Sequence, residues 1–133
     1  MSAIEDAGRI HYQLQRLFTW TADAETYGLR EHWDDHYDDF KAGRQIRDDC
    51  DGFSLTAAMI ALKDYPVPPG KISLALCLTE VGIRLKNPPA YDHIVCVVDG
   101  YVIDNRLRRV VTKGQAGYLW DRAMRLDEIG HWR

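Results

Sequence analysis

Apolar residues near the start of the chain recur with the spacing of one face of an α-helix. Between residues 3 and 18 these positions are Ile4, Ala7, Ile10, Leu14, Leu17 and Phe18. This spacing predicts an amphipathic N-terminal helix. A second stripe, at Trp33, Tyr37 and Phe40, is interrupted by acidic residues. It predicts a short helix within 30–41 that packs its aromatic face on the core.

Residues 50–63 read CDGFSLTAAMIALK and leave almost no polar helix face. A helix of this kind belongs in the interior of a domain. We therefore predict a buried helix with Cys50 at its N-terminus. Asp48 and Asp49 precede it, and such acids are good N-caps that also suit the helix dipole. The prolines of residues 65–70 must end the helix, because proline cannot continue it.

The second half of the chain has the alternation and the turn residues of β-strands. Residues 71–85 are predicted to form one strand. Residues 93–98 and 101–105 are predicted to form a hairpin around Asp99-Gly100. The tail from 114 to 133 is mixed and is predicted either to form a terminal helix or to cover the sheet. The fold class is therefore α+β, with helices first and an antiparallel sheet afterwards.

The length of the hairpin turn decides which side chains share a face of the sheet. With a two-residue turn, Asp104 lies diagonal to His93 on the same face. A three-residue loop would exchange the faces and bring Asn105 beside His93 instead. Asp-Gly is a favoured type I′ pair, and Tyr101 suits a strand better than a loop. We therefore predict the two-residue turn.

Composition and charge narrow the classes of function. The chain has 133 residues, of which 46% are hydrophobic, enough for a single domain over 1–133 with one core. A net charge of −3 argues against a nucleic-acid partner. No apolar run approaches the ~18 residues of a membrane span. The first residues lack the pattern of a signal peptide, so we expect a cytoplasmic protein with reduced thiols. A chain trimmed of its export signal would instead be periplasmic.

The three cysteines differ in their surroundings. Cys50 is predicted at a helix N-terminus, where the dipole favours the nucleophilic thiolate, although the acids on either side oppose this effect. Cys96 points away from His93 because side chains alternate along a strand. Cys77 lies among apolar residues with no obvious base, so we expect Cys77 and Cys96 in the core. Cys50 is the candidate nucleophile, with His93 as base and Asp104 orienting the histidine.

His32 and His36 are spaced i, i+4 beside acidic residues, a spacing that zinc sites use. The H-E-x-x-H pattern of zinc proteases is absent, because Trp33 and Asp34 follow His32. We therefore expect these two histidines on a solvated helix face.

Three segments occur in the order that is typical of a known family: RDDCDGF at 47–53, DHIV at 92–95 and IDNR at 103–106. Together with WDDHYDDF at 33–40 and GHW at 130–132, these segments resemble the bacterial transglutaminase-like cysteine proteinases over roughly residues 30–132. That group includes periplasmic proteases that cut large adhesins from the cell surface. The resemblance implies a papain-like core, in which a helix bearing Cys50 packs on an antiparallel sheet bearing His93 and Asp104.

The resemblance also implies roles for the residues around Cys50. In periplasmic members, carboxylates beside the cysteine help to bind calcium, and Asp49 and Asp51 occupy these positions here. Those members typically read Asp-Cys-Glu-Asp-Tyr, whereas this chain has Gly52 after Asp51. The alternative is that both acids cap the helix and balance its dipole. An oxyanion donor is also needed, and the backbone N–H of Cys50 and the side chain of Gln45 are candidates.

The sequence thus predicts a thiol hydrolase, a peptidase or amidase, that forms an acyl-enzyme on a peptide or protein substrate and requires no cofactor. Capture of the same intermediate by an amine would give transglutaminase-type acyl transfer. A third interpretation is a binding module that kept the fold without turnover. Neither the substrate nor the oligomeric state is identified by the sequence.

Overall fold

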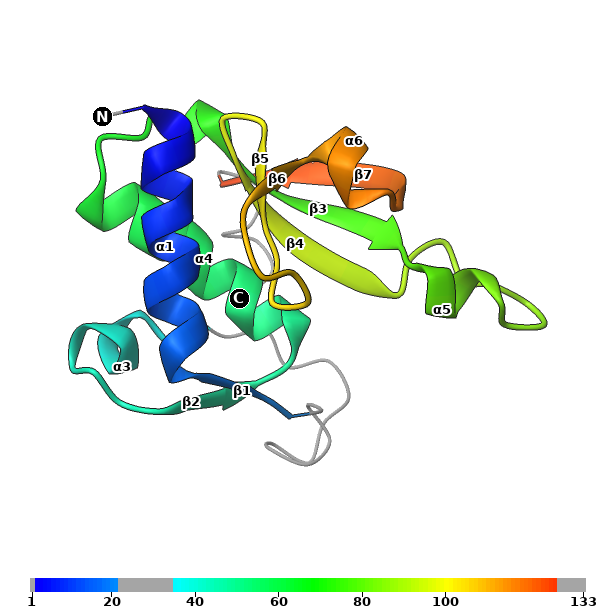
Figure 1. The fold of residues 1–133 in the computed structure, drawn as a ribbon, viewed down its shortest axis with the longest axis horizontal. Helices are drawn as coiled ribbons and strands as arrows, with labels where there is room; N and C mark the ends of the chain where they lie inside the picture. The colour runs from blue at the N-terminus through cyan, green and yellow to red at the C-terminus, as the bar shows by residue number, and fades with distance from the viewer. Residues whose placement is uncertain (1, 22–34, 127–133) are drawn as a thin grey trace.

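The computed structural model describes residues 2–21 and 35–126 (Figure 1). In chain order the elements are α1 (Ala3–Leu17), β1 (Phe18–Trp20), α3 (Tyr37–Lys41), β2 (Ile46–Asp48), α4 (Cys50–Asp64), η1 (Pro69–Lys71), β3 (Ile72–Leu78), α5 (Glu80–Ile83), β4 (His93–Val98), β5 (Tyr101–Ile103), β6 (Val111–Thr112), α6 (Lys113–Ala116) and β7 (Leu119–Arg125). β1 and β2 form a parallel pair, and the other five strands form an antiparallel sheet in the order β6-β5-β4-β3-β7. The predicted α+β class is confirmed.

The two long predicted helices are present, and α4 has the acidic cap that was expected. α1 begins after Ser2, whose side chain accepts the Glu5 N–H. α4 begins after Asp49, whose side chain accepts the Asp51 N–H. Every residue of α4 from Asp51 to Ala61 is buried, because the helix packs against both α1 and strands β3 and β4 (Figure 1). No helix in the described ranges has the length and apolar character to cross a membrane.

The sheet carries a layer of packed side chains on each face. The face toward α1 and α4 contributes to the main core with alternate residues of β3 and β4: Ile72, Leu74, Leu76, Ile94, Cys96 and Val98. The opposite face holds a second cluster: Ala75, Cys77, Val95, Val97, Val102 and Tyr118. Cys77 and Cys96 are fully buried in these layers, so their predicted place in the core is confirmed.

The hairpin between β4 and β5 has the predicted register. Val98 pairs with Tyr101, which leaves Asp99 and Gly100 as the turn. Their φ angles are +48° and +87°, the positive values that a type I′ turn requires. The two-residue turn is therefore confirmed, and Asp104 follows β5 on the side predicted from that register.

Three segments differ from their predictions. Residues 71–85 do not form one strand, because β3 ends at Leu78 and Thr79 caps the short helix α5. The tail contains β7, which pairs with β3 instead of forming a helix or a loose cover. The aromatic helix predicted within 30–41 is described only as α3, and Trp33 lies outside the described residues.

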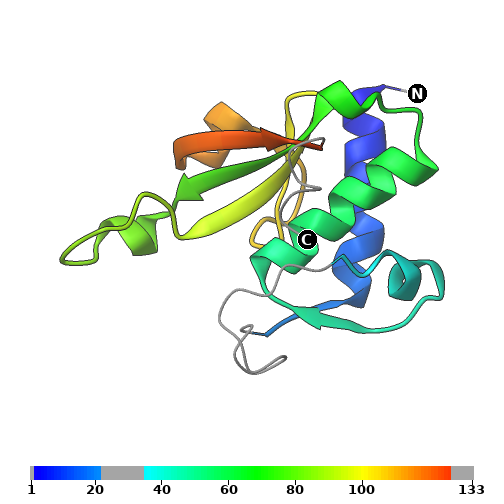
Figure 2. The same ribbon diagram turned by 180° about the vertical axis from the view of Figure 1, so that it is seen from behind.

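Residues 80–91, which include α5, connect β3 to β4 and extend away from α1 and α4 in both views (Figures 1 and 2). We call this segment the arm. Its base is fixed by the Asp92 carboxylate, which accepts the Thr79 N–H at 2.8 Å and the Thr79 hydroxyl at 2.7 Å. A Cβ added to Gly82 would lie 2.5 Å from this carboxylate, so a glycine is required there. The two ends of the arm are thus joined directly beside His93.

Candidate active site

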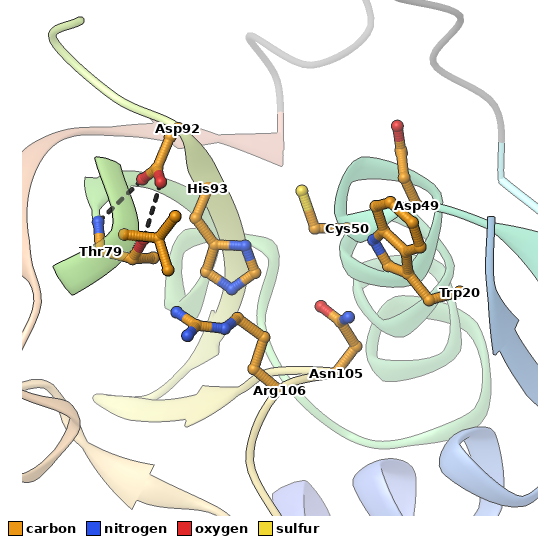
Figure 3. A pocket seen from close by; sticks show the side chains of 9 residues that line it. Trp20, Asp49, Cys50, Thr79, Asp92, His93, Asn105 and Arg106 are labelled. Atoms are coloured by element: carbon orange, nitrogen blue, oxygen red, sulfur yellow. Dashed lines mark hydrogen bonds between the residues drawn. The ribbon is translucent and has the colours of Figure 1, made fainter. Parts of the chain in front are cut away.

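A cleft of about 600 Å³ opens where β4 begins, beside the first turn of α4 (Figure 3). Cys50 and Asp49 reach it from the start of α4, Trp20 from β1 and His93 from β4. The remaining lining residues come from the arm with its base and from the loop after β5: Thr79, Val81, Asp92, Asn105 and Arg106. The fold therefore brings the predicted nucleophile and the predicted base to one cleft.

Cys50 is half-buried at the first position of α4. One turn later, the Ser54 hydroxyl donates to the Ile94 carbonyl at 2.9 Å, which joins the helix to the strand directly after His93. Burial raises the pKa of the Cys50 thiol, a backbone hydrogen bond with Ile94 lowers it, and neighbouring carboxylates, first Asp49, raise it further. The net pKa lies above the ordinary value, so the resting sulfur is protonated at neutral pH. Burial and the neighbouring acids together outweigh the hydrogen bond with Ile94, and burial is a cause that the sequence analysis did not weigh.

His93 and Asp104 lie side by side, with Nε2 of the imidazole 2.7 Å from Oδ1 of the carboxylate. Both side chains are buried, with exposed fractions of 5% and 0%. Since the carboxylate holds Nε2, Nδ1 is the ring nitrogen left for the cleft. Burial opposes ionisation of Asp104. However, the hydrogen bond and charge of His93, with smaller contributions from Arg106 and Tyr118, bring the pKa of Asp104 below its ordinary value. Asp104 is therefore ionised and able to stabilise an imidazolium.

The loop that carries Asp104 is held by residues that the sequence did not indicate. The Tyr118 hydroxyl donates to Oδ2 of Asp104 at 2.6 Å. From α1, Nε2 of His11 lies 3.0 Å from the Asp104 carbonyl, and the Gln15 amide donates to the Asn105 carbonyl at 3.1 Å. His11 and Gln15 are one helical turn apart and thus bind two consecutive carbonyls. No local pattern in the sequence signals contacts between residues so far apart along the chain.

Cys77 is the direct cross-strand neighbour of His93, a relation that the sequence analysis missed. Its side chain is fully buried, and it is not among the residues that line the cleft. Burial, together with nearby carboxylates, raises the pKa of Cys77 to about 12. Because a substrate carbonyl cannot reach this buried thiol, Cys50 is the candidate nucleophile.

Three carboxylates gather at the start of α4. Asp48, Asp49 and Asp51 each offer an oxygen within 4.8 Å of the others. The fold already uses two of them, since Asp49 caps the helix and buried Asp48 accepts the Asp49 N–H and lies 2.7 Å from Nε2 of His36. These bonds support the capping interpretation, and calcium at Asp49 and Asp51 stays a prediction. The solvated position expected for His36 is wrong, because it is half-buried beside Asp48, while His32 lies outside the described residues.

Gln45 is exposed, and its amide donates to the Thr19 hydroxyl at 2.7 Å. It does not line the cleft, and its role as an oxyanion donor stays a prediction. Asn105, which the sequence placed on the opposite side from His93, does line the cleft (Figure 3). Its side-chain oxygen is buried without a hydrogen-bond partner among the described residues. Strand alternation held for Asp104, directly after β5, but not for Asn105, because β5 ends at Ile103 and the chain has left the strand path by then.

Comparisons with known proteins assign no family to the chain. No family model matches it, and no curated protein matches it either. The interpretation of the cleft therefore rests on the side chains that line it and on those that hold them.

Proposed function

We propose that this protein is a cysteine hydrolase that acts on peptide or amide bonds through an acyl-enzyme, with Cys50 as nucleophile and His93 as base. One observation carries the proposal: Cys50 and His93 line the same cleft while Asp104 holds the far nitrogen of the imidazole at 2.7 Å. A nucleophile, a base and a group that orients the base are the parts that activate a weak nucleophile.

The setting of these residues supports a papain-like, transglutaminase-like core. In that fold, a helix bearing the cysteine packs on an antiparallel sheet bearing the histidine and the acid. Here α4 packs on β4, which begins with His93, and Asp104 directly follows β5. The motifs around Cys50, His93 and Asp104 point to the same family resemblance.

The reaction starts from a protonated thiol, because the pKa of Cys50 is raised. As Sγ attacks the substrate carbonyl carbon, its proton passes to Nδ1 of His93, and the Asp104 carboxylate stabilises the imidazolium. The backbone N–H of Cys50, at the positive end of α4, is the candidate donor to the oxyanion. When the C–N bond breaks, His93 returns the proton to the leaving amine, and a thioester on Cys50 remains.

Hydrolysis of the thioester completes the cycle. Water attacks the carbonyl carbon and gives a proton to His93. The C–S bond breaks, a carboxylic acid leaves, and the sulfur takes the proton back from the imidazolium. Protons therefore balance over the two steps, and no external oxidant or reductant enters.

The test uses p-nitrophenyl acetate, a small activated ester that can react with the nucleophile without specific contacts to the rest of the cleft. Mass spectrometry of the quenched protein should find one acetyl group on Cys50, and the wild type should release nitrophenol. Cys50→Ala should lose both signals. Cys77→Ala is the matched control and should keep both, because Cys77 does not line the cleft.

Acetylation of a different residue, or hydrolysis that persists in Cys50→Ala, would refute the assignment. Transfer of the acetyl group to added methylamine in preference to water would identify acyl transfer. Failure of the wild-type protein to form any acetyl adduct would favour a binding module on the same fold.

A further inference from the structure

We infer that the arm, residues 80–91, binds the substrate chain beyond the cleft and selects a polypeptide segment rich in apolar and acidic residues. The inference rests on the proposed function, because it takes the occupant of the cleft to be a polypeptide. It adds the class of substrate, which the residues around Cys50 do not specify.

Large apolar side chains are concentrated on the arm. Their exposed fractions are 60% for Val81, 47% for Ile83, 53% for Leu85 and 36% for Tyr91. These are four of the eight large hydrophobic residues that are exposed in the described ranges. A fifth, Trp20, lines the cleft on the side of Cys50 (Figure 3). Exposed apolar residues that gather in one place, and are not scattered singly, mark a binding surface.

Beyond its first residue, Glu80, which forms an ion pair with Arg106, the arm carries only positive charges. From 81 to 91 it contains Arg84 and Lys86 and no acidic residue, although the whole chain has a net charge of −3. Neither cation forms a salt bridge with any residue in the described ranges. A partner segment with carboxylates next to apolar side chains would complement both features of the arm.

The arm is continuous with the cleft. Val81 belongs to the arm and lines the cleft, and so do Thr79 and Asp92 at the base of the arm. The hydrogen bonds between Thr79 and Asp92, together with the ion pair of Glu80 with Arg106, fix this base. A chain whose carbonyl lies at Cys50 and that continues past His93 therefore meets Val81 first. A surface held in place in this way loses little conformational entropy when it binds. This shared lining favours a polypeptide over a membrane surface as the occupant.

Binding is measured with the Cys50→Ala protein, so that the result does not depend on turnover. The probes are fluorescein-labelled peptides of equal length with alternating Leu/Glu, Leu/Lys or Ser/Glu residues, followed by fluorescence anisotropy. The Leu/Glu peptide should bind most tightly. Val81→Ser combined with Leu85→Ser should weaken its binding by roughly tenfold or more, as expected from the loss of large apolar contacts. Ile4→Ser is the matched control, since it removes a side chain of 49% exposure from α1, and binding should be unchanged.

A charge-reversal variant tests the second half of the inference. Arg84→Glu combined with Lys86→Glu should shift the preference from the Leu/Glu peptide to the Leu/Lys peptide. Equal binding of all three peptides, unchanged binding by the serine variant, or no measurable binding would overturn the inference. Preferential binding to vesicles of phosphatidylserine and phosphatidylcholine would assign the arm to a membrane, and self-association lost in the serine variant would assign it to a second copy of the chain. Either result would also overturn it.

The two proposals fail in different ways. If the ester does not acetylate Cys50 while the peptides still bind through the arm, the proposed reaction is refuted and the inference about the binding surface is supported. If Cys50 is acetylated but peptide binding does not depend on the arm, the reaction stands and the inference about the arm falls.

Discussion

Replacement of Gly52 by alanine tests how closely the start of α4 is packed. An added Cβ would lie 2.0 Å from Oδ2 and 2.3 Å from Cγ of Asp48, far inside contact distance. Asp48 is buried, lies 2.7 Å from Nε2 of His36 and accepts the Asp49 N–H at 2.8 Å. The Asp48 side chain would have to move, and these two hydrogen bonds would be lost.

The expected size of the effect follows from two opposing contributions. Losing two hydrogen bonds to a buried carboxylate costs about 1.5–3 kcal/mol each, about 3–6 kcal/mol together. Alanine in place of glycine in a helix gains about 1 kcal/mol. Gly52→Ala should therefore lower the free energy of unfolding by about 2–5 kcal/mol. Gly8 in α1 is the matched control, because an added Cβ meets no atom within 4 Å there. Gly8→Ala should raise the free energy of unfolding by about 0.5–1 kcal/mol.

Urea unfolding followed by circular dichroism measures both variants, and a double variant isolates the contact. Asp48→Gly removes the carboxylate and also the Asp48 Cβ, which would otherwise lie 2.7 Å from the added atom. In that background Gly52→Ala should cost nothing further, so the two effects should be strongly non-additive. A Gly52→Ala protein as stable as the wild type, or strictly additive effects in the double variant, would show that the close contact with Asp48 does not govern this position.

Four further predictions concern the site. Iodoacetamide should label Cys50 before the two buried cysteines, and the rate should rise with pH because the pKa of the thiol is raised; a fast rate that is constant from pH 6 would contradict the protonated thiol. Asp104→Ala should lower kcat by orders of magnitude and Asn105→Ala only mildly, and the reverse ranking in steady-state kinetics would assign the orienting role to Asn105. The pKa of Asp104 is lower in the folded protein than in the unfolded chain, where it is about 4. Ionised Asp104 therefore stabilises the folded state above about pH 4, and this stabilisation is lost as the pH falls through the folded pKa. Tyr118→Phe removes a donor, so acid unfolding should begin at higher pH and stability at pH 7 should fall by about 1.5–3 kcal/mol; an unchanged acid transition would exclude this role of the tyrosine. If the acids beside Cys50 bind calcium, millimolar calcium should raise the Tm and a chelator should reverse the shift, whereas no shift would favour capping alone.

The parts of the fold that could be predicted are those governed by local rules. An Asp-Gly turn and the two-residue period of a strand were sufficient to place Asp104 beside His93. The lack of a polar face was sufficient to bury α4, and acidic residues before Cys50 gave the position of its start. Each of these rules acts within a few residues, so the sequence contains all that it needs.

The parts that were missed depend on distant partners. β7 lies at the edge of the sheet and buries little beyond Met124, so its residues show no strand-like alternation. Residues 79–85 read like the end of a strand until Asp92 binds Thr79, which caps a helix instead. His11 and Tyr118 became part of the site only because the fold brings α1 and the segment before β7 to Asp104.

The two hydrogen bonds from α1 to the loop after β5 span 93 and 90 residues. A ribosome makes α1 first and this loop much later, so Cys50 and His93 exist in the growing chain before His11 and Gln15 have anything to hold. A nascent or partly unfolded chain with α1 detached would keep Cys50 and His93. The loop that carries Asp104 would, however, lose its two hydrogen bonds to α1. If Cys50 is the nucleophile, full reactivity would be reached only after α1 has packed against the loop that carries Asp104, that is, by molecules that have finished folding.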